Sequence, residues 1–501
     1  MENRNIQPYG EYPPRKLQSI TFPTGKKEVV FAGLILLTSL ALCNFVLKGG
    51  FSLGFALATI GSIVCSAGYL LASGCKPTAY SGSLLALSCV IVAGYARSDD
   101  GFVKLVMLFF LLVSSNLGLS LLAENYRYRP GGVLSLLDAP RALFALGVGN
   151  LPESCRGLGQ AFRKSGSVGQ KGGAFLLGLC VAIPVLAVMI PLLISADAAF
   201  DGLIALLPEF EIGELIRTVI FGGILAFWLY TRGVALRHSE KESKKETVVK
   251  GISSITVNTA LSAVCGLYVV YLFSQLAYLS GGFSGILPEA YTMAEYARRG
   301  FFEMAWLCGI NLGIIALSVG LVRGTDKKPL STRLLCLFVG IVTLFLVATA
   351  SAKMFLYIDA YGLTRLRVLT QIVMLFLAWV TLFVMVWLFV PKLPYMKAVL
   401  LAGLLIGAVT LWADVDTQVA RYNVDAYLSG KLETVDVSYI RNLGAGAVEQ
   451  LARLEQEAPD EDVRVKVRDF LLTYTLHPGE DFRGWNYADH CAAKYLPTTE
   501  E

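Results

Sequence analysis

The sequence predicts an all-α membrane protein that crosses the bilayer about eleven times. The chain is 55% hydrophobic and 16% charged, with a mean hydropathy of +0.60, whereas soluble chains are roughly 45–50% apolar and about 25% charged. Its apolar runs recur at lengths that suit a helix crossing ~30 Å of hydrocarbon. These runs must be helices, because lipid offers the backbone no hydrogen-bond partner.

The elements follow in order from the hydropathy pattern. Residues 1–28 are polar and contain Pro8, Pro13, Pro14 and Pro23, which predicts a disordered cytoplasmic lead. The eleven predicted spans are 29–46, 51–73, 80–96, 102–123, 172–195, 217–236, 252–279, 301–322, 333–351, 369–390 and 398–413.

Lysine and arginine set the orientation, because cytoplasmic loops are enriched in them. With the N-terminus inside, the inner segments carry 25 Lys/Arg and the outer loops with their helix ends carry nine. The prediction is therefore N-in. An odd number of spans then places residues 414–501 outside the cell.

Five regions are expected along the chain. After the lead come a four-helix membrane bundle (29–123), a cytoplasmic connector (124–171) and a seven-helix membrane domain (172–413). The last region, 414–501, is an acidic tail with nine Lys/Arg and seventeen Asp/Glu. Apolar residues recur at helical spacing in this tail, which predicts a few short helices: Leu443, Ala447, Leu451, Leu454, Val463, Val467, Phe470, Leu471 and Tyr474.

The first candidate site is the polar stretch between two spans that holds Glu295, Tyr296, Arg298 and Arg299. In a helix, Glu295 and Arg299 lie one turn apart and can pair. Two arginines on the outer side run against the charge bias, and the planar guanidinium suits carboxylate or phosphate. The stretch is therefore either an anion site or a set of internal ion pairs.

The next outer loop has similar chemistry. Lys353, Tyr357, Tyr361 and Arg365 recur every four residues and share one helix face, which Asp359 and Arg367 flank. Such a stripe suits a lipid phosphate or an acidic sugar, and it equally suits an interfacial anchor. Arg421 and Asn423, just after the last span, complete the expected ligand-binding surface.

Outer aspartates support an alternative, a membrane-embedded transferase that acts on a lipid-linked substrate with a divalent metal. The candidates for it are Asp99, Asp197, Asp201, Asp414 and Asp416. Paired acids also occur at ordinary helix starts. We therefore predict no metal site and no cofactor; if a metal did bind, its candidate ligands would be Asp197, Asp201, Asp414 and Asp416.

A transporter or flippase is the second alternative. No Asp, Glu, Lys or Arg lies near the centre of a predicted span, whereas ion-coupled transporters often carry one there. Basic residues are spread over short loops instead of one patch, so nucleic acid is not an expected partner.

Several pieces of the chain resemble a bacterial family of polytopic membrane proteins, domain of unknown function 4173, and its relative 4153. They are Ser195–Asp201, Asn258–Leu261, Glu295–Phe302, Tyr357–Arg365, Ala420–Asn423 and Trp485–Asn486. The resemblance covers roughly residues 170–490. It implies a multi-pass protein of the bacterial cytoplasmic membrane and supplies no activity.

These observations lead to one expected function. We expect a non-enzymatic integral membrane protein that recognises an anionic lipid, an envelope component or a membrane protein partner at the outer face of the membrane.

Overall fold

The computed structural model describes residues 22, 25–128, 130–164, 189, 212–239, 252–283, 301–322, 329–474 and 481–496. Throughout these residues the regular structure is helical, with no strand, and ten helices are long and apolar enough to cross a membrane. This confirms the all-α, multi-pass prediction.

The ten long helices coincide with ten of the eleven predicted spans. The predicted span 172–195 lies outside the described residues, apart from residue 189. The ten are α1 (Lys26–Gly49), α2 (Leu53–Ala72), α3 (Ala79–Ala93), α4 (Gly101–Leu122), α10 (Ile212–His238), α11 (Ser254–Phe283), α13 (Phe301–Leu321), α14 (Leu330–Tyr361), α15 (Arg365–Phe389) and α16 (Tyr395–Ala413).

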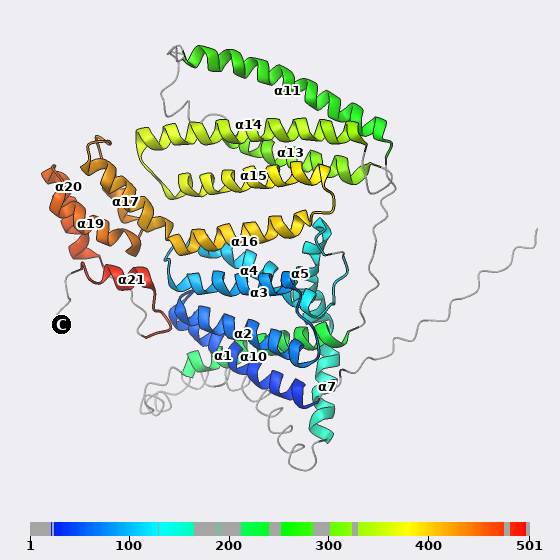
Figure 1. Cartoon of the computed structure of the whole chain (residues 1–501). Helices are drawn as coiled ribbons and strands as arrows, with labels where there is room; N and C mark the ends of the chain where they lie inside the picture. The colour runs from blue at the N-terminus through cyan, green and yellow to red at the C-terminus, as the bar shows by residue number, and fades with distance from the viewer. Residues whose placement is uncertain are drawn as a thin grey trace, which may run out of the picture.

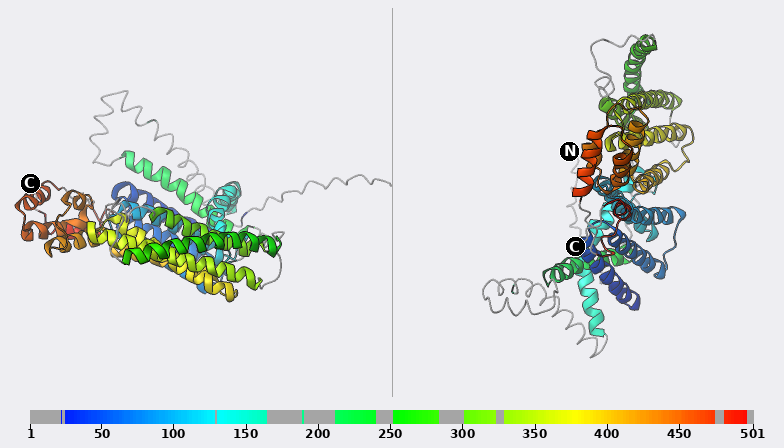
Figure 2. Two further views of the ribbon diagram at one scale, coloured as in Figure 1. Left: turned by 90° about the horizontal axis from the view of Figure 1, so that it is seen from above. Right: turned by 90° about the vertical axis from the view of Figure 1, so that its left-hand side faces the viewer.

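The long helices lie side by side in a curved row that runs from α11 through α14, α15 and α16 to α3, α2 and α1 (Figures 1 and 2). Helix α16 packs against both α15 and α3, so the last span joins the later helices to the early ones. Helix α10 packs against α1 and α2. The early spans therefore share a core with a helix that follows the connector in sequence.

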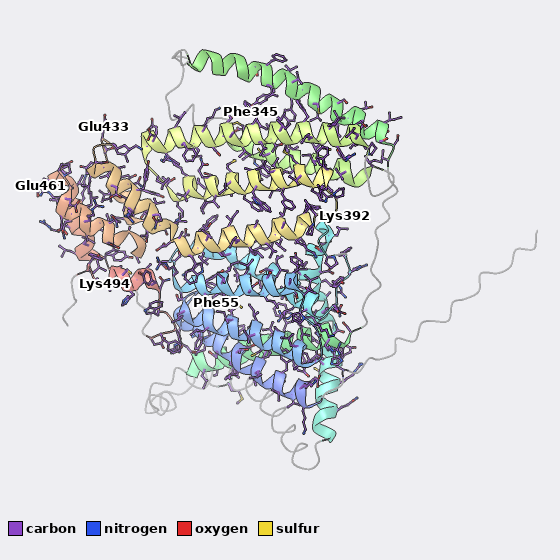
Figure 3. All side chains as sticks on the ribbon, viewed as in Figure 1. Phe55, Phe345, Lys392, Glu433, Glu461 and Lys494 are labelled. Carbon is purple, nitrogen blue, oxygen red and sulfur yellow. The ribbon has the colours of Figure 1, made fainter. Side chains whose placement is uncertain are left out.

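The row has two faces, one at each end of its helices, and these two helix ends differ. Short connector helices, among them α5 (Asp138–Pro140) and α7 (Leu151–Lys164), lie at one end, which we call the connector face. The C-terminal helices lie at the opposite end, the tail face. In Figure 3, Glu433, Glu461 and Lys494 lie at the tail face, Lys392 lies toward the connector face, and Phe55 and Phe345 lie between them.

The sides of the row are apolar. Ile255, Phe273 and Trp306 are 75%, 70% and 74% exposed. Large apolar side chains at such exposure are unfavourable in water over so wide a surface, and they match the hydrocarbon core of a bilayer. The row is therefore built to be surrounded by lipid.

The tail forms a small helical unit with its own core. Its helices are α17 (Val415–Leu428), α18 (Val437–Arg441), α19 (Ala445–Glu457), α20 (Glu461–Thr473) and α21 (Tyr487–Ala492). The core is built from the predicted apolar positions, with Ala447, Leu451, Leu454 and Val467 fully buried. The predicted helices of the tail are confirmed.

The tail is hydrogen-bonded to the spans. The Leu53 and Gly54 N–H groups donate to the carbonyls of Trp485 and Arg483 at 3.2 and 3.0 Å. The Asn486 side chain donates to the Ser98 carbonyl at 2.9 Å. The tail is therefore bound to the backbone at the α1–α2 turn. This contact brings the Arg483 backbone close to Gly49.

Replacing Gly49 with alanine should loosen this contact. A Cβ at this position would lie 2.5 Å from the Arg483 carbonyl oxygen, inside van der Waals contact with backbone. Overpacking of this kind costs about 1–3 kcal/mol. Limited proteolysis should cut the tail of G49A faster than that of the parent protein. Gly68→Ala on α2, where a Cβ meets nothing within 4 Å, is the control and should leave the cleavage rate unchanged.

Candidate functional site at the junction of the tail and the membrane helices

The predicted site residues fall into two groups. Glu295, Tyr296, Arg298, Arg299, Asp197 and Asp201 lie outside the described residues. The others lie around the turn between α14 and α15, where it meets α17: Tyr357, Asp359, Tyr361, Arg365, Asp414, Asp416, Arg421 and Asn423.

Asn423 fixes the turn. Its side-chain oxygen accepts from the Leu363 N–H and its side-chain nitrogen donates to the Leu363 carbonyl, both at 2.7 Å. The preceding Gly362 has φ +74°, and a Cβ there would lie 2.5 Å from the Asn423 oxygen. Asn423 is 7% exposed. It satisfies a buried backbone, which occupies the hydrogen-bonding groups that a ligand would need.

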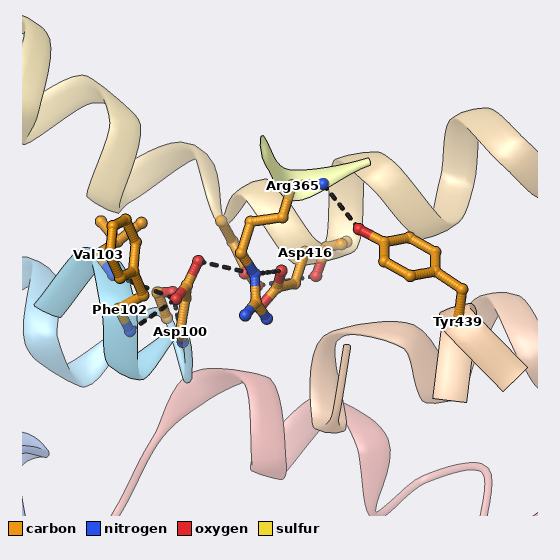
Figure 4. A network of polar contacts seen from close by, with 9 residues as sticks. Asp100, Phe102, Val103, Arg365, Asp416 and Tyr439 are labelled. Atoms are coloured by element: carbon orange, nitrogen blue, oxygen red, sulfur yellow. Dashed lines mark hydrogen bonds and ion pairs between the residues drawn. The ribbon is translucent and has the colours of Figure 1, made fainter. Parts of the chain in front are cut away.

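Arg365 is held between two aspartates (Figure 4). Its Nε and Nη2 donate to the two Asp416 carboxylate oxygens at 2.7 and 2.6 Å. Its Nε also lies 3.1 Å from Asp100 Oδ2. The Arg365 backbone N–H donates to the Tyr439 hydroxyl oxygen at 2.7 Å. One residue thereby joins the start of α15 to α4 and to two helices of the tail.

Asp100 is also the N-cap residue of α4. Its Oδ1 accepts from the Phe102 and Val103 N–H groups at 2.9 and 3.1 Å. An aspartate at a helix N-terminus satisfies free backbone donors and interacts favourably with the helix dipole. These hydrogen bonds orient the Asp100 carboxylate independently of its contact with Arg365.

Acidic groups outnumber basic ones in this junction. The side chain of Lys104 is buried, and Asp99, Asp100, Asp414 and Asp489 act on its charge. Burial raises the pKa of Asp416 to about 6, although Arg365 opposes the shift. Burial also raises the pKa of Asp414, whose Oδ2 accepts from the Thr417 hydroxyl at 2.8 Å.

A second, more exposed group of residues, which we call the rim, surrounds Arg367 near the start of α15. The Arg367 guanidinium lies 4.0 Å from the Tyr357 ring centroid. Its Nη1 donates to the carbonyls of Tyr361 and Gly362. The Tyr357 and Tyr361 rings lie 5.2 Å apart. No carboxylate of the described residues pairs with Arg367, which leaves its Nε and Nη2 for another acceptor.

The other charges of the rim are paired. Lys431 lies 2.5 Å from Asp359. Asp425 lies 2.5 Å from Arg453 and 3.8 Å from Arg421. These exposed pairs contribute little stability. Arg367, in contrast, has no counter-ion among the residues described.

Two apolar grooves flank α15 below the junction. The first, of about 480 Å³, lies between α14 and α15 and is lined by Val347, Ser351, Phe355, Ile358, Leu363, Val368, Gln371, Ile372, Met374, Leu375 and Ala378. The second, of about 310 Å³, lies between α4, α15 and α16. Phe102 and Val103, which follow Asp100, line the second groove.

No metal centre is visible in the described part of the chain, where no three His, Cys, Asp or Glu side chains are arranged to hold an ion. Of the paired acids Asp414 and Asp416, the second is occupied by Arg365. Asp414 and Asp416 therefore do not form a carboxylate pair that could hold the metal ion of a transferase.

Sequence reasoning placed Arg365 and Asp416 in different candidate sites and did not connect either of them with Asp100 or Tyr439. Arg367 was recognised beside the four-residue stripe but was not included in the predicted binding surface. The signal that was present is its position two residues after Arg365 at the start of a span, where two cations face the same interface.

Together these features define a polytopic α-helical membrane protein whose helical tail is fastened to its spans by buried ion pairs. A sequence profile of the family described as Domain of unknown function (DUF4153) matches residues 82–454, most of the chain, and the chain belongs to this family. The match starts in α3 and ends in α19. It confirms the relative 4153 and not the assignment to 4173. No curated protein and no solved structure matches the chain.

Replacing Arg365 with glutamine should detach the tail. The change leaves Asp100 and Asp416 buried without a cation, and breaking a buried pair costs several kcal/mol. Because the Arg365 side chain is 31% exposed, we expect about 3 kcal/mol, at the low end of that range. Thermal unfolding and tail proteolysis in detergent measure it.

The control is Arg464→Gln, which removes an exposed pair with Glu461 and should change stability by less than about 0.5 kcal/mol. The triple variant D100N/R365Q/D416N removes all three charges and should recover part of the loss. Equal effects of R365Q and R464Q would contradict the role assigned to Arg365.

Mild acidification should raise the free energy of unfolding through Asp416. The folded-state pKa of Asp416 is raised to about 6, above its unfolded value near 3.9. The folded protein therefore binds this proton more tightly, and the stability so gained is lost as pH rises through 6. Between pH 5 and pH 7.5 the difference is on the order of 1 kcal/mol.

The measurement is thermal unfolding of the parent protein and of D416N at pH 5, 6 and 7.5. The parent should lose stability relative to D416N as pH rises across this window. A constant difference between the two proteins would show that Asp416 does not titrate there.

Proposed function

We propose that the protein binds an anionic phospholipid at the tail face, with the phosphate at Arg367 and an acyl chain in the groove between α14 and α15. The observation that carries this proposal is Arg367, a rim cation without a carboxylate partner among the described residues, at the end of an apolar groove. Catalysis is not part of the proposal.

The headgroup contact follows from the chemistry of the rim. A guanidinium with free Nε–H and Nη2–H groups presents two parallel donors, which fit a phosphate. Stacking on Tyr357 holds the cation in place. Tyrosine rings beside a cation are also the usual composition of the bilayer interface.

The acyl contact follows from the groove. Leu363 and Val368 line it at the end next to Arg367, and Phe355 and Leu375 on its walls are 62% and 65% exposed. A groove open to the hydrocarbon core is filled by lipid chains, because apolar surface is their only neighbour at this depth. Its volume of about 480 Å³ suits one chain.

The proposal narrows the expected binding surface. Tyr357 and Tyr361 stay in it, and Arg367 joins it. Arg365 and Asn423 leave it, because their polar groups hold the tail. The charge bias of the loops supports the tail face as the outer face of a bacterial cytoplasmic membrane.

Arg367→Gln should weaken binding of phosphatidylglycerol about tenfold, since one charge-assisted bidentate contact contributes about 1.4 kcal/mol. Binding is measured by native mass spectrometry of the detergent-purified protein titrated with phosphatidylglycerol or phosphatidylcholine. The parent should prefer the anionic lipid, and R367Q should bind both equally.

Arg441→Gln is the matched control, because Arg441 also lies over an aromatic ring, 4.7 Å from the Phe470 centroid, but on the tail helix α18. This variant should keep the preference. Retained preference in R367Q, or no preference in the parent, would refute the lipid site.

A further inference from the structure

Arg232 is a buried arginine inside the membrane bundle. It lies on α10 six residues before its last residue His238, about 9 Å along the helix axis, and it is 5% exposed. Its Nη1 donates to Asn116 Oδ1 at 2.9 Å and its Nη2 donates to Ser66 Oγ at 3.2 Å. Its Nε has no hydrogen-bond partner.

The charge of this side chain is permanent, because a guanidinium does not lose its proton in proteins. Both of its partners are neutral, and no carboxylate of the described residues forms an ion pair with it. Glu28, a carboxylate on the neighbouring α1, is engaged by the Gly25 N–H, the Tyr69 hydroxyl and His238. A cation in a low-dielectric interior needs more compensation than two dipoles supply.

The surroundings are polar enough to accept an ion. The helices that face Arg232 bury Ser62 and Ser66 on α2 and Ser115 and Asn116 on α4. The Ser66 hydroxyl accepts from Nη2, so its own hydrogen is free to turn toward an anion. The Nε–H of Arg232, which has no acceptor, and the Ser66 O–H beside Nη2 are thus two donors from which one anion can accept.

We infer that Arg232 binds a small inorganic anion, of the size and charge of chloride, at its Nε/Nη2 edge beside Ser66. The site lies between α2, α4 and α10, toward the connector face, and it is independent of the lipid site at the tail face. A lipid phosphate is too large for this position, because the guanidinium is enclosed by neighbouring helices.

The experiment replaces chloride by gluconate at constant ionic strength and follows thermal unfolding of the full chain in detergent. Gluconate is too bulky for the enclosed edge. The parent protein should unfold about 2–4 °C lower in gluconate than in chloride, as expected when a ligand of the folded state is removed. Equal unfolding temperatures would overturn the inference.

Asn116→Asp tests the site directly. It places a carboxylate 2.9 Å from Nη1 with almost no change in shape, so the protein supplies its own counter-ion and the dependence on chloride should vanish. The control is Asn125→Asp, an equally buried amide whose oxygen accepts from Arg141 Nη2 at 3.2 Å. N125D should keep the chloride dependence. Persistent dependence in N116D would refute the site.

A direct measurement covers the case in which a variant does not fold. Chloride-35 NMR of the parent protein should show line broadening that bromide displaces in a saturable manner. Broadening that bromide does not displace, or none above a detergent blank, would equally overturn the inference.

Discussion

Two buried aspartates on either side of Arg365 govern how this protein is assembled. Asp100 belongs to the start of α4, Arg365 to the start of α15, and Asp416 to the first tail helix. A charge at such a position is costly without partners, and its partners are equally costly without it. The three groups are therefore stable only together, which fixes the tail against two separate parts of the helix row.

This fixed junction shapes both grooves beside α15. Residues that line the grooves lie within about one turn of the ion pairs, among them Phe102, Leu363 and Val368. Asn423 and Tyr439 of the tail hold the turn that leads into α15. Any ligand in either groove thus lies next to a tail whose attachment depends on charge, and movement of the tail would alter the groove ends first.

Hydropathy predicted the ten described spans well, because crossing a bilayer is a local requirement on about 20 consecutive residues. The tail helices were also predictable, from apolar spacing at positions such as Leu451 and Val467. The site was not. Arg365 and Asp416 were recognised as separate candidates, one for an anion and one for a metal, and folding brings them together so that they neutralise each other. Such pairing is non-local and leaves no trace in spacing.

Arg232 and Arg365 show two solutions to the same physical problem. Sequence reasoning counted Arg232 among the connector-side cations that set the orientation, because it lies near the end of a predicted span. Its side chain instead lies inside the bundle, against an amide and a hydroxyl. Arg365 is paired with carboxylates of its own chain and so holds the tail to the membrane helices. Arg232 has only neutral partners, and the unmet part of its charge is what makes it a receptor for an anion.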